Sequence, residues 1–169
     1  MLCADSAGYN RVLYRPELKK VARAVARKLA RLIDKTGADA VVVTGKSGIA
    51  MGFAAAMFAD IPLVTLRKQG DSTHGLRIEG PHILVTRYII LDDFIDSGAT
   101  VERIDNEIAE YAECVNRGTP PICVGIIEYL HSAYGYKDWD LPRSGKVTVY
   151  NLKRQADWND VPTINRRQS

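Results

Sequence analysis

Apolar residues recur at three- and four-residue steps from Pro16 to Thr36. This spacing lines them up along one side of a helix, and it predicts an amphipathic helix whose apolar face packs against the rest of the protein. Pro16 suits the first turn of that helix, and Gly37 suits its end. The apolar positions are Leu18, Val21, Ala22, Val25, Leu29, Leu32 and Ile33.

Short apolar runs alternate with helical patterns along the rest of the chain. The run from Ala40 to Thr44 is rich in β-branched residues and predicts a strand that is covered on both faces. A Gly-rich loop at 45–48 is then expected before a helix at 49–59. Such alternation predicts a parallel sheet with helices on both faces. The other expected elements are strands at 61–66, 83–85, 88–91, 121–127 and 147–152, a helix at 99–115 and a polar loop at 69–80.

The length of the chain fits one globular domain. A chain of 169 residues buries a sizeable core without disulfides or metal staples. We therefore expect residues 1–169 to form a single α/β domain, with a mostly parallel twisted sheet and a core at about 38–152. After Tyr129 the pattern weakens, and an irregular segment precedes the last expected strand.

Positive charge is concentrated in the first expected helix. The chain carries a net charge of +3, but the segment from Arg15 to Thr36 holds eight Lys or Arg against Glu17 and Asp34. That segment carries +6, so the remainder of the chain carries −3. No aromatic or Gly residue is interleaved with the basic ones, so a solvated helix face is favoured over a nucleic-acid or membrane surface.

Cysteine usage and hydropathy indicate a cytoplasmic protein. Cys3, Cys114 and Cys123 have no C-x-x-C spacing, which fits a reduced compartment. The amino terminus shows no charged segment followed by an apolar run of secretory length, and no apolar stretch approaches the roughly 20 residues that span a bilayer. We therefore expect no membrane partner.

The segment from Tyr88 to Thr100 combines features that suit a ribose phosphate. Four apolar residues run into Asp92 and Asp93, which are expected at the carboxyl edge of a parallel sheet, where ligands collect. Adjacent carboxylates repel each other, and this cost is offset when they bind sugar hydroxyls or a hydrated Mg²⁺. The turn at 96–100 then offers backbone N–H groups, hydroxyls and the positive end of a helix, which suit a phosphate.

This segment resembles the 5-phosphoribosyl 1-pyrophosphate (PRPP) binding motif of the type I phosphoribosyltransferases. That motif is an apolar strand, two acidic residues, two apolar residues and a short loop rich in Thr, Ser and Gly, and every position here fits it. The resemblance implies that the chain binds PRPP and a nucleobase and releases pyrophosphate and a nucleotide. The implied PRPP-binding residues of the motif are Asp92, Asp93, Asp96, Ser97, Gly98, Ala99 and Thr100.

Two further segments resemble the same family. Residues 41–52 are similar to its first strand and pyrophosphate loop, where the family often has a cis peptide, here expected at Gly45-Lys46. This segment is not a Walker A loop, because position 40 is Ala instead of the required Gly. Arg67-Lys68 resembles a pair that adenine and orotate members place beside the diphosphate, and 69–80 takes the place of their hood loop. The implied diphosphate-binding residues are Gly45, Lys46, Ser47, Gly48, Arg67 and Lys68.

The resemblance also implies a mechanism, in which a nitrogen of the base attacks C1 of the ribose through a transition state like an oxocarbenium ion. Asp92 and Asp93 would orient the ribose hydroxyls and anchor Mg²⁺ indirectly, through water or those hydroxyls. Lys68, with Lys46, would take up the charge of the leaving diphosphate and is one candidate catalytic residue. Asp96 is the other, because 6-oxopurine members carry at the matching position an Asp that handles the purine proton.

The sequence leaves the identity of the base open. Asp96 favours a 6-oxopurine, but it also suits a carboxylate that caps the next helix. Glu128 lies where 6-oxopurine members commonly have a Lys that reads the ring oxygen. A ring that stacks on the base is expected from a small irregular hood at 1–15 and 128–165. The resemblance ranks Trp158 first, because it follows the last expected strand, where related xanthine-guanine enzymes place a stacking residue, and Tyr129 and Trp139 come next.

Two alternatives follow from other features of the chain. Arg67-Lys68 fits an adenine or orotate phosphoribosyltransferase. The basic helix and the sequence Asp92-Asp93-Phe94, which a purine-repressor relative shares, fit a non-catalytic PRPP-sensing regulator. No winged-helix segment accompanies them, so nucleic acid is not an expected partner. The family resemblance further implies a homodimer.

Overall fold

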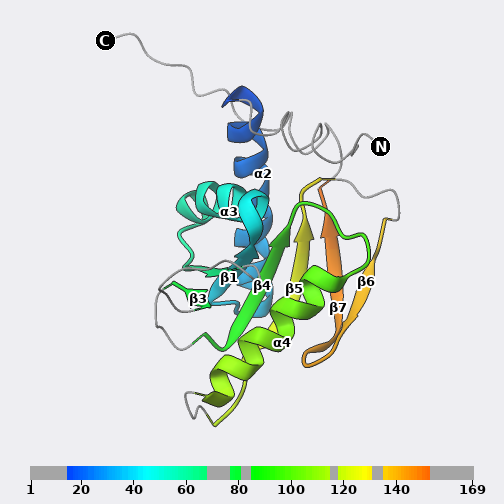
Figure 1. The fold of residues 1–169 in the computed structure, drawn as a ribbon. Coiled ribbons are helices and arrows are strands. Elements are labelled where there is room, and N and C mark those ends of the chain that lie inside the picture. The colour runs from blue at the N-terminus through cyan, green and yellow to red at the C-terminus, as the bar shows by residue number, and fades with distance from the viewer. Residues whose placement is uncertain (1–14, 68–76, 81–84, 115–117, 131–134, 153–169) are drawn as a thin grey trace.

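Over the residues that the structure describes, seven strands form one sheet at the centre of the protein. The computed structural model describes residues 15–67, 77–80, 85–114, 118–130 and 135–152. The strand order is β3-β2-β1-β4-β5-β7-β6 (Figure 1). The strands are β1 Ala40–Thr44, β2 Leu63–Leu66, β3 Ile78–Glu79, β4 Arg87–Asp92, β5 Ile122–Glu128, β6 Asp138–Leu141 and β7 Gly145–Asn151.

The neighbours β2, β1, β4, β5 and β7 run parallel, and the outer strands β3 and β6 run antiparallel to them. This arrangement confirms the expected α/β domain with a mostly parallel sheet. Parallel strands all end at the same edge of a sheet, which is where ligands usually bind. Thr44, Asp92 and Glu128, the last residues of β1, β4 and β5, therefore lie along one edge.

Helices cover both faces of the sheet, as the alternating pattern predicts (Figure 1). The helices α2 Arg15–Thr36 and α3 Gly45–Ala59 lie on one face, and α4 Ala99–Cys114 lies on the other. Val41 and Val43 of β1 join the core that contains α2 and α3, whereas Val42 joins the core that contains α4. None of the helices described here is long and apolar enough to cross a membrane.

The expectation of a loop at 45–48 is wrong, because α3 begins at Gly45, directly after β1. Gly45 has a φ of +68°, a left-handed conformation that glycine adopts at little cost, so the chain turns from strand into helix without a linker. Gly48 then lies close to β1, where a Cβ on it would be 3.4 Å from Cβ of Val43. These two glycines let α3 start at the edge of the sheet.

The two antiparallel edge strands are not predicted by the sequence pattern. β3 lies within the expected polar loop, and β6 lies within the expected irregular segment. The expected strand at 61–66 begins later, at Leu63, because Pro62 has no N–H for a strand ladder. Of the expected strand at 83–85, Val85 is not in a strand and the other two residues lie outside the described part of the chain.

Candidate functional site

The turn between β4 and α4 holds most of the residues expected to bind PRPP. Gly98 has a φ of +78°, and α4 begins at the next residue. The amide of Ala99 donates a hydrogen bond to Ser97 Oγ at 3.4 Å, and the amide of Glu102 donates to the Gly98 carbonyl at 3.0 Å. The turn is therefore a tight bend at the N-terminus of a helix, an arrangement that favours anions.

Asp92 and Asp93 stand at the entrance to this turn in different surroundings. Asp92 is 6% exposed, whereas Asp93 is half-buried. Asp92 Oδ1 accepts the amide of Asp93 at 3.0 Å, and Asp93 Oδ1 accepts the amide of Phe94 at 3.2 Å. Burial, and after it the negative charge of Asp93, raise the pKa of Asp92 to about 8. A cation or hydroxyl donors at this point would favour the ionised carboxylate.

A cavity of about 310 Å³ joins this turn to the start of α3. Its volume lies at the lower end of the range for small-molecule sites. The residues that line it come from two segments that are distant in the sequence, 44–47 and 92–103. The parallel pairing of β1 with β4 brings these segments together. The expected PRPP-binding residues that line the cavity are Gly45, Ser47, Asp92, Asp93, Asp96, Ser97, Gly98, Ala99 and Thr100.

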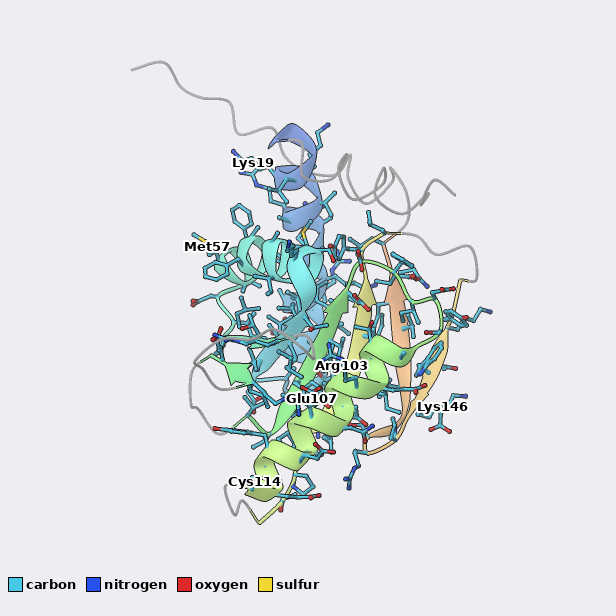
Figure 2. The ribbon with its side chains drawn as sticks, in the orientation of Figure 1. Lys19, Met57, Arg103, Glu107, Cys114 and Lys146 are labelled. Carbon is cyan, nitrogen blue, oxygen red and sulfur yellow. The ribbon has the colours of Figure 1, made fainter. Side chains whose placement is uncertain are left out.

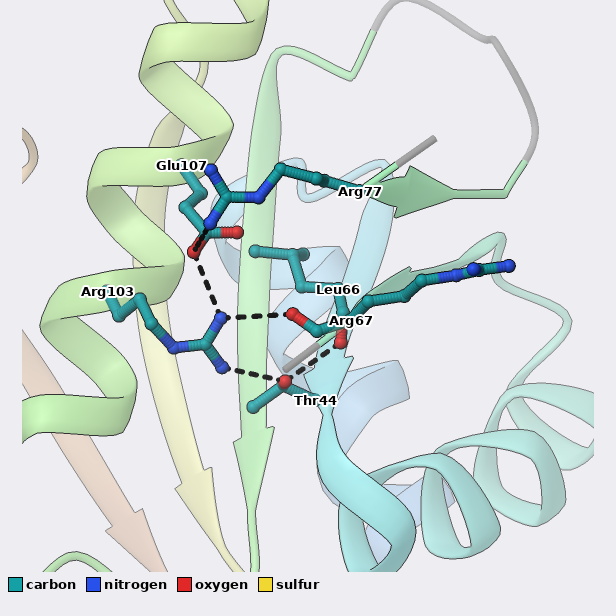
Figure 3. A network of polar contacts seen from close by, with 6 residues as sticks. All are labelled: Thr44, Leu66, Arg67, Arg77, Arg103 and Glu107. Atoms are coloured by element: carbon teal, nitrogen blue, oxygen red, sulfur yellow. Dashed lines mark hydrogen bonds and ion pairs between the residues drawn. The ribbon is translucent and has the colours of Figure 1, made fainter. Parts of the chain in front are cut away.

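Three expected site residues that the structure describes, Lys46, Gly48 and Arg67, do not line this cavity. Lys46 is exposed beside it, between Gly45 and Ser47, and Gly48 is buried behind it. The side chain of Arg67, which follows β2, extends away from Arg103 (Figure 3). It forms an ion pair with Glu79. Lys68 and Trp158 lie outside the residues that the structure describes. No described peptide bond is cis, so the expectation of a cis bond at Gly45-Lys46 is wrong.

Arg103 of α4 lines the cavity and is not among the residues expected from the sequence. Its guanidinium donates to Thr44 Oγ1 at 2.8 Å, to the Arg67 carbonyl at 3.3 Å and to Glu107 Oε1 at 3.1 Å (Figure 3). Thr44 Oγ1 in turn donates to the Leu66 carbonyl at 2.8 Å. The network ties α4 to the ends of β1 and β2 and brings a cation to the cavity wall. One signal in the sequence is the place of Arg103, about one helical turn beyond the turn at 96–100.

Glu107 extends this network to the edge strand. Glu107 Oε1 also accepts a hydrogen bond from Arg77 Nη2 at 3.1 Å, and Arg77 lies directly before β3 (Figure 3). The backbone amide of Arg67 donates to the Arg77 carbonyl at 3.0 Å. The chain entering residue 68 and the chain leaving residue 76 are therefore both held against α4.

Glu128 is a second residue near the cavity that is not among the expected site residues. It is the partner of Asp92 in the β4–β5 ladder and is fully buried. Glu128 Oε1 accepts the amide of Ile95 at 3.0 Å, which fixes the backbone between the two carboxylates and the turn. Glu128 thus supports the site from beneath, and it is not among the residues that line the cavity.

The aromatic candidates for base stacking are not supported where the structure describes them. Tyr129 is 1% exposed and belongs to the core beneath α2 and α3. The indole of Trp139 packs against Gly98, and Trp139 does not line the cavity. Among the described residues that line the cavity, the aromatic one is Phe94.

The carboxylates fit Mg²⁺ as an indirectly held ion. Among the described residues, no group of three or more His, Cys, Asp or Glu could hold a metal by itself. Mg²⁺ usually keeps several waters and takes one or two carboxylates together with phosphate oxygens of the substrate. Asp92 and Asp93 supply such a donor set, and a bound cation would favour the ionised form of Asp92, whose pKa is raised first by burial and then by the charge of Asp93.

Solved structures share this fold. Adenine phosphoribosyltransferase from Saccharomyces cerevisiae, complexed with an imino-altritol bisphosphate and adenine, is 16% identical over 82% of this chain and 79% of its own, with a TM-score of 0.57. Another adenine phosphoribosyltransferase is 16% identical over 82% of this chain and 81% of its own, with a TM-score of 0.58. Orotate phosphoribosyltransferase from Francisella tularensis is 17% identical over 77% of this chain, with a TM-score of 0.50.

Sequence comparisons add no closer relative, because no family model and no curated protein matches the chain. The chain spans 58% of the Francisella protein and 24% of a Leishmania donovani UMP synthase that it also matches. Likeness at such low identity establishes the fold alone. The protein therefore has the fold of the adenine and orotate phosphoribosyltransferases.

Proposed function

We propose that the protein is a phosphoribosyltransferase that moves the 5-phosphoribosyl group of PRPP to a nucleobase and releases pyrophosphate. One observation carries the proposal: the Asp92-Asp93 pair, the turn at 96–100 and the start of α3 line one cavity. These parts match the ribose hydroxyls, the 5-phosphate and the diphosphate of a single molecule. The shared fold supports the same conclusion.

In this proposal the protein holds PRPP at both of its phosphorylated ends. Amides of the turn at 96–100 bind the 5-phosphate, and Asp92 and Asp93 accept hydrogen bonds from the ribose hydroxyls. Arg103, with Lys46 and the N-terminus of α3, stabilises the negative charge that departs with the diphosphate. Mg²⁺, when bound, would neutralise part of that charge. A catalytic role for Lys68 and a stacking role for Trp158 stay predictions.

A 6-oxopurine is the base that we favour. Asp96 lines the cavity and is exposed, and its carboxylate forms no hydrogen bond or ion pair with another described residue. Ser97 Oγ, not Asp96, accepts the amide of the first residue of α4. This geometry supports Asp96 as the group that exchanges a proton with the purine ring over its alternative role as a helix cap.

An adenine or orotate phosphoribosyltransferase is the alternative. Enzymes of both kinds are among the matching structures, and Arg67 lies directly after β2, where the resemblance expects the Arg-Lys pair. A non-catalytic PRPP sensor is a further alternative, which we consider because α2 is rich in Lys and Arg.

Release of pyrophosphate from PRPP, measured with Mg²⁺ and one base at a time, separates these alternatives. Turnover with guanine, xanthine or hypoxanthine supports the proposal in full, and turnover with adenine or orotate alone supports the alternative. Binding of PRPP without turnover of any base indicates a sensor. Absence of any PRPP binding contradicts all three.

We predict that Asp93→Asn lowers kcat/KM for PRPP on the order of a hundredfold or more, because the neutral amide accepts hydroxyl donors more weakly. The thermal unfolding curve is expected to stay close to that of the wild type. Asp138→Asn is the control, since Asp138 pairs with Lys146 on the surface at 3.3 Å. Unchanged kinetics in Asp93→Asn would remove the carboxylate pair from the mechanism.

A further inference from the structure

Two aromatic residues near β6 contact the turn that is proposed to bind the 5-phosphate. The hydroxyl of Tyr136 donates a hydrogen bond to the Asp96 carbonyl at 3.2 Å. Trp139 Nε1 donates to Glu102 Oε1, in the first turn of α4, at 3.3 Å. The two rings meet edge to face, with centroids 4.8 Å apart and planes at 84°. The turn is therefore in contact with an aromatic pair.

The indole of Trp139 lies directly against the backbone of Gly98. A Cβ built on Gly98 would overlap Cζ2 and the neighbouring ring carbons of the indole. Gly98 also has a positive φ, so a side chain there would be strained twice over. Tyr136 and Trp139 are not among the residues that line the cavity, so both rings support the turn from outside it.

The segment that carries the two rings is itself held firmly. Asn151 Nδ2 of β7 donates to the Tyr136 carbonyl at 2.9 Å. At the other end of the β6–β7 hairpin, the fully buried Asp105 of α4 accepts the amides of Arg143 at 2.7 Å and Ser144 at 3.1 Å. The rings are thus fixed relative to α4, whose first turn follows Gly98.

We infer that Tyr136 and Trp139 are positioning residues that hold the turn at 96–98 in the shape needed to bind a phosphate monoester. The inference rests on the proposed function. Amide donors bind a phosphate well only when their placement is fixed to within a fraction of an ångström, and a turn of Asp, Ser and Gly has little stiffness of its own. The hydrogen bond to the Asp96 carbonyl extends the same support to the residue proposed to face the base.

Calorimetric titration with ribose 5-phosphate and, separately, with pyrophosphate tests this role, with Mg²⁺ present in both. Trp139→Ala is expected to weaken ribose 5-phosphate binding on the order of tenfold or more. Pyrophosphate binding should stay within about twofold, because its proposed site is at the start of α3. Trp139→Phe keeps a ring over Gly98 and should restore most of the affinity. Tyr136→Phe keeps the ring but removes the hydroxyl that donates to the Asp96 carbonyl, and a weaker loss of ribose 5-phosphate affinity than in Trp139→Ala is expected.

Tyr150→Ala is the matched control. Tyr150 lies on β7, and its ring packs against Gly125 and Lys28, away from the turn. A loss of thermal stability comparable to that of Trp139→Ala, with ribose 5-phosphate affinity unchanged, would show that the effect of Trp139 is specific to the turn. Equal weakening of both ligands in Trp139→Ala, or no weakening of either, would overturn the inference. Failure of the wild-type protein to bind any ribosyl phosphate would instead overturn the proposed function.

Discussion

Asp92 combines burial with a second carboxylate next to it in the chain. Its pKa is about 8 in the folded protein, against an ordinary value of 3.8. Between these two pH values the unfolded chain has released the proton of Asp92 and the native protein still holds it. The unfolded state then binds fewer protons, so the free energy of unfolding falls as the pH rises through this range.

We predict that Asp92→Asn removes much of this pH dependence. Without ligand or Mg²⁺, the variant should exceed the wild type in stability at pH 9, by on the order of a few kcal/mol. The difference should shrink as the pH falls toward 4, where Asp92 is protonated in both states. Urea unfolding of both proteins between pH 4 and 9 measures this difference in the free energy of unfolding. If the difference between variant and wild type were the same at every pH, Asp92 would not be the group responsible.

Arg103 provides a second prediction for a single side chain. Arg103→Ala removes a cation from the cavity wall and leaves Thr44 Oγ1 without its donor. Pyrophosphate binding should weaken by roughly tenfold to a hundredfold, because a hydrogen bond to a charged group is worth about 1.5–3 kcal/mol. Ribose 5-phosphate should be affected far less, which is the reverse of the pattern expected for Trp139→Ala. Calorimetry with both ligands measures the contrast.

The control for this variant is Arg143→Ala. The side chain of Arg143 is half-exposed and pairs at 3.4 Å with Glu113, which is also exposed, so its loss should change neither affinity. Arg103→Lys keeps the charge but not the forked geometry, and an intermediate affinity is expected. If Arg103→Ala weakened the binding of pyrophosphate and of ribose 5-phosphate equally, Arg103 would act by stabilising the fold and not by binding the diphosphate.

At the scale of elements, the close contact of α3 with β1 depends on Gly52. A Cβ at this position would lie 2.7 Å from Val43 Cγ1 and 3.1 Å from Leu63 Cδ1. Gly52→Ala gains helix propensity, but the overlap is expected to outweigh it, with a net loss of about 1–2 kcal/mol in the free energy of unfolding. Urea unfolding measures the loss.

The overlap can be separated from the effect on the helix. In a Val43→Ala background the same Gly52→Ala change should cost less, because the two Val43 methyl groups are gone and only the contact with Leu63 Cδ1 stays. Gly118→Ala is the control, since no atom lies within 4 Å of its Cβ position. A stabilising effect of Gly52→Ala in the wild-type background would mean that α3 shifts freely over β1.

Elements buried on both faces were predictable from the sequence, and those at the edges were not. β1, β4 and β5 consist of apolar runs whose length and composition indicate a covered strand, and α2 shows one apolar side. β6 is a short stretch of Asp, Trp and Leu that becomes a strand only by pairing with β7. The start of α3 differs from the expectation because glycines usually indicate a loop, whereas here Gly45 turns the chain directly into the helix and Gly48 allows tight packing on β1.

The same distinction holds for the candidate site. Asp92, Asp93 and the turn at 96–100 are adjacent in the chain, so local chemistry was enough to predict that they act together. Arg103, Glu128 and Trp139 reach the site through a helix face, a neighbouring strand and a hairpin. Their roles depend on tertiary contacts, which a single sequence does not display.

At the scale of the whole molecule, we predict a homodimer, as the family resemblance implies. Phe53, Met57 and Phe58 of α3 are 61%, 79% and 52% exposed, and Figure 2 shows Met57 projecting outward from the helix. Clustered apolar exposure of this kind is uncommon in monomers, because water contacts it at a cost. Light scattering at micromolar concentration should give twice the 18.7 kDa of one chain. The mass of a single chain would contradict the prediction.

The outer strands of the sheet have a consequence for solubility. A long, uncharged outer strand can recruit the backbone of another molecule and start aggregation. Here β3 has two residues, and β6 carries exposed Asp138 and Asp140 along its four. The hairpin that contacts the turn at 96–98 thus also places carboxylates where an incoming strand would pair, although Asp138 is paired with Lys146, and repulsion between copies at Asp140 discourages fibril growth at that border.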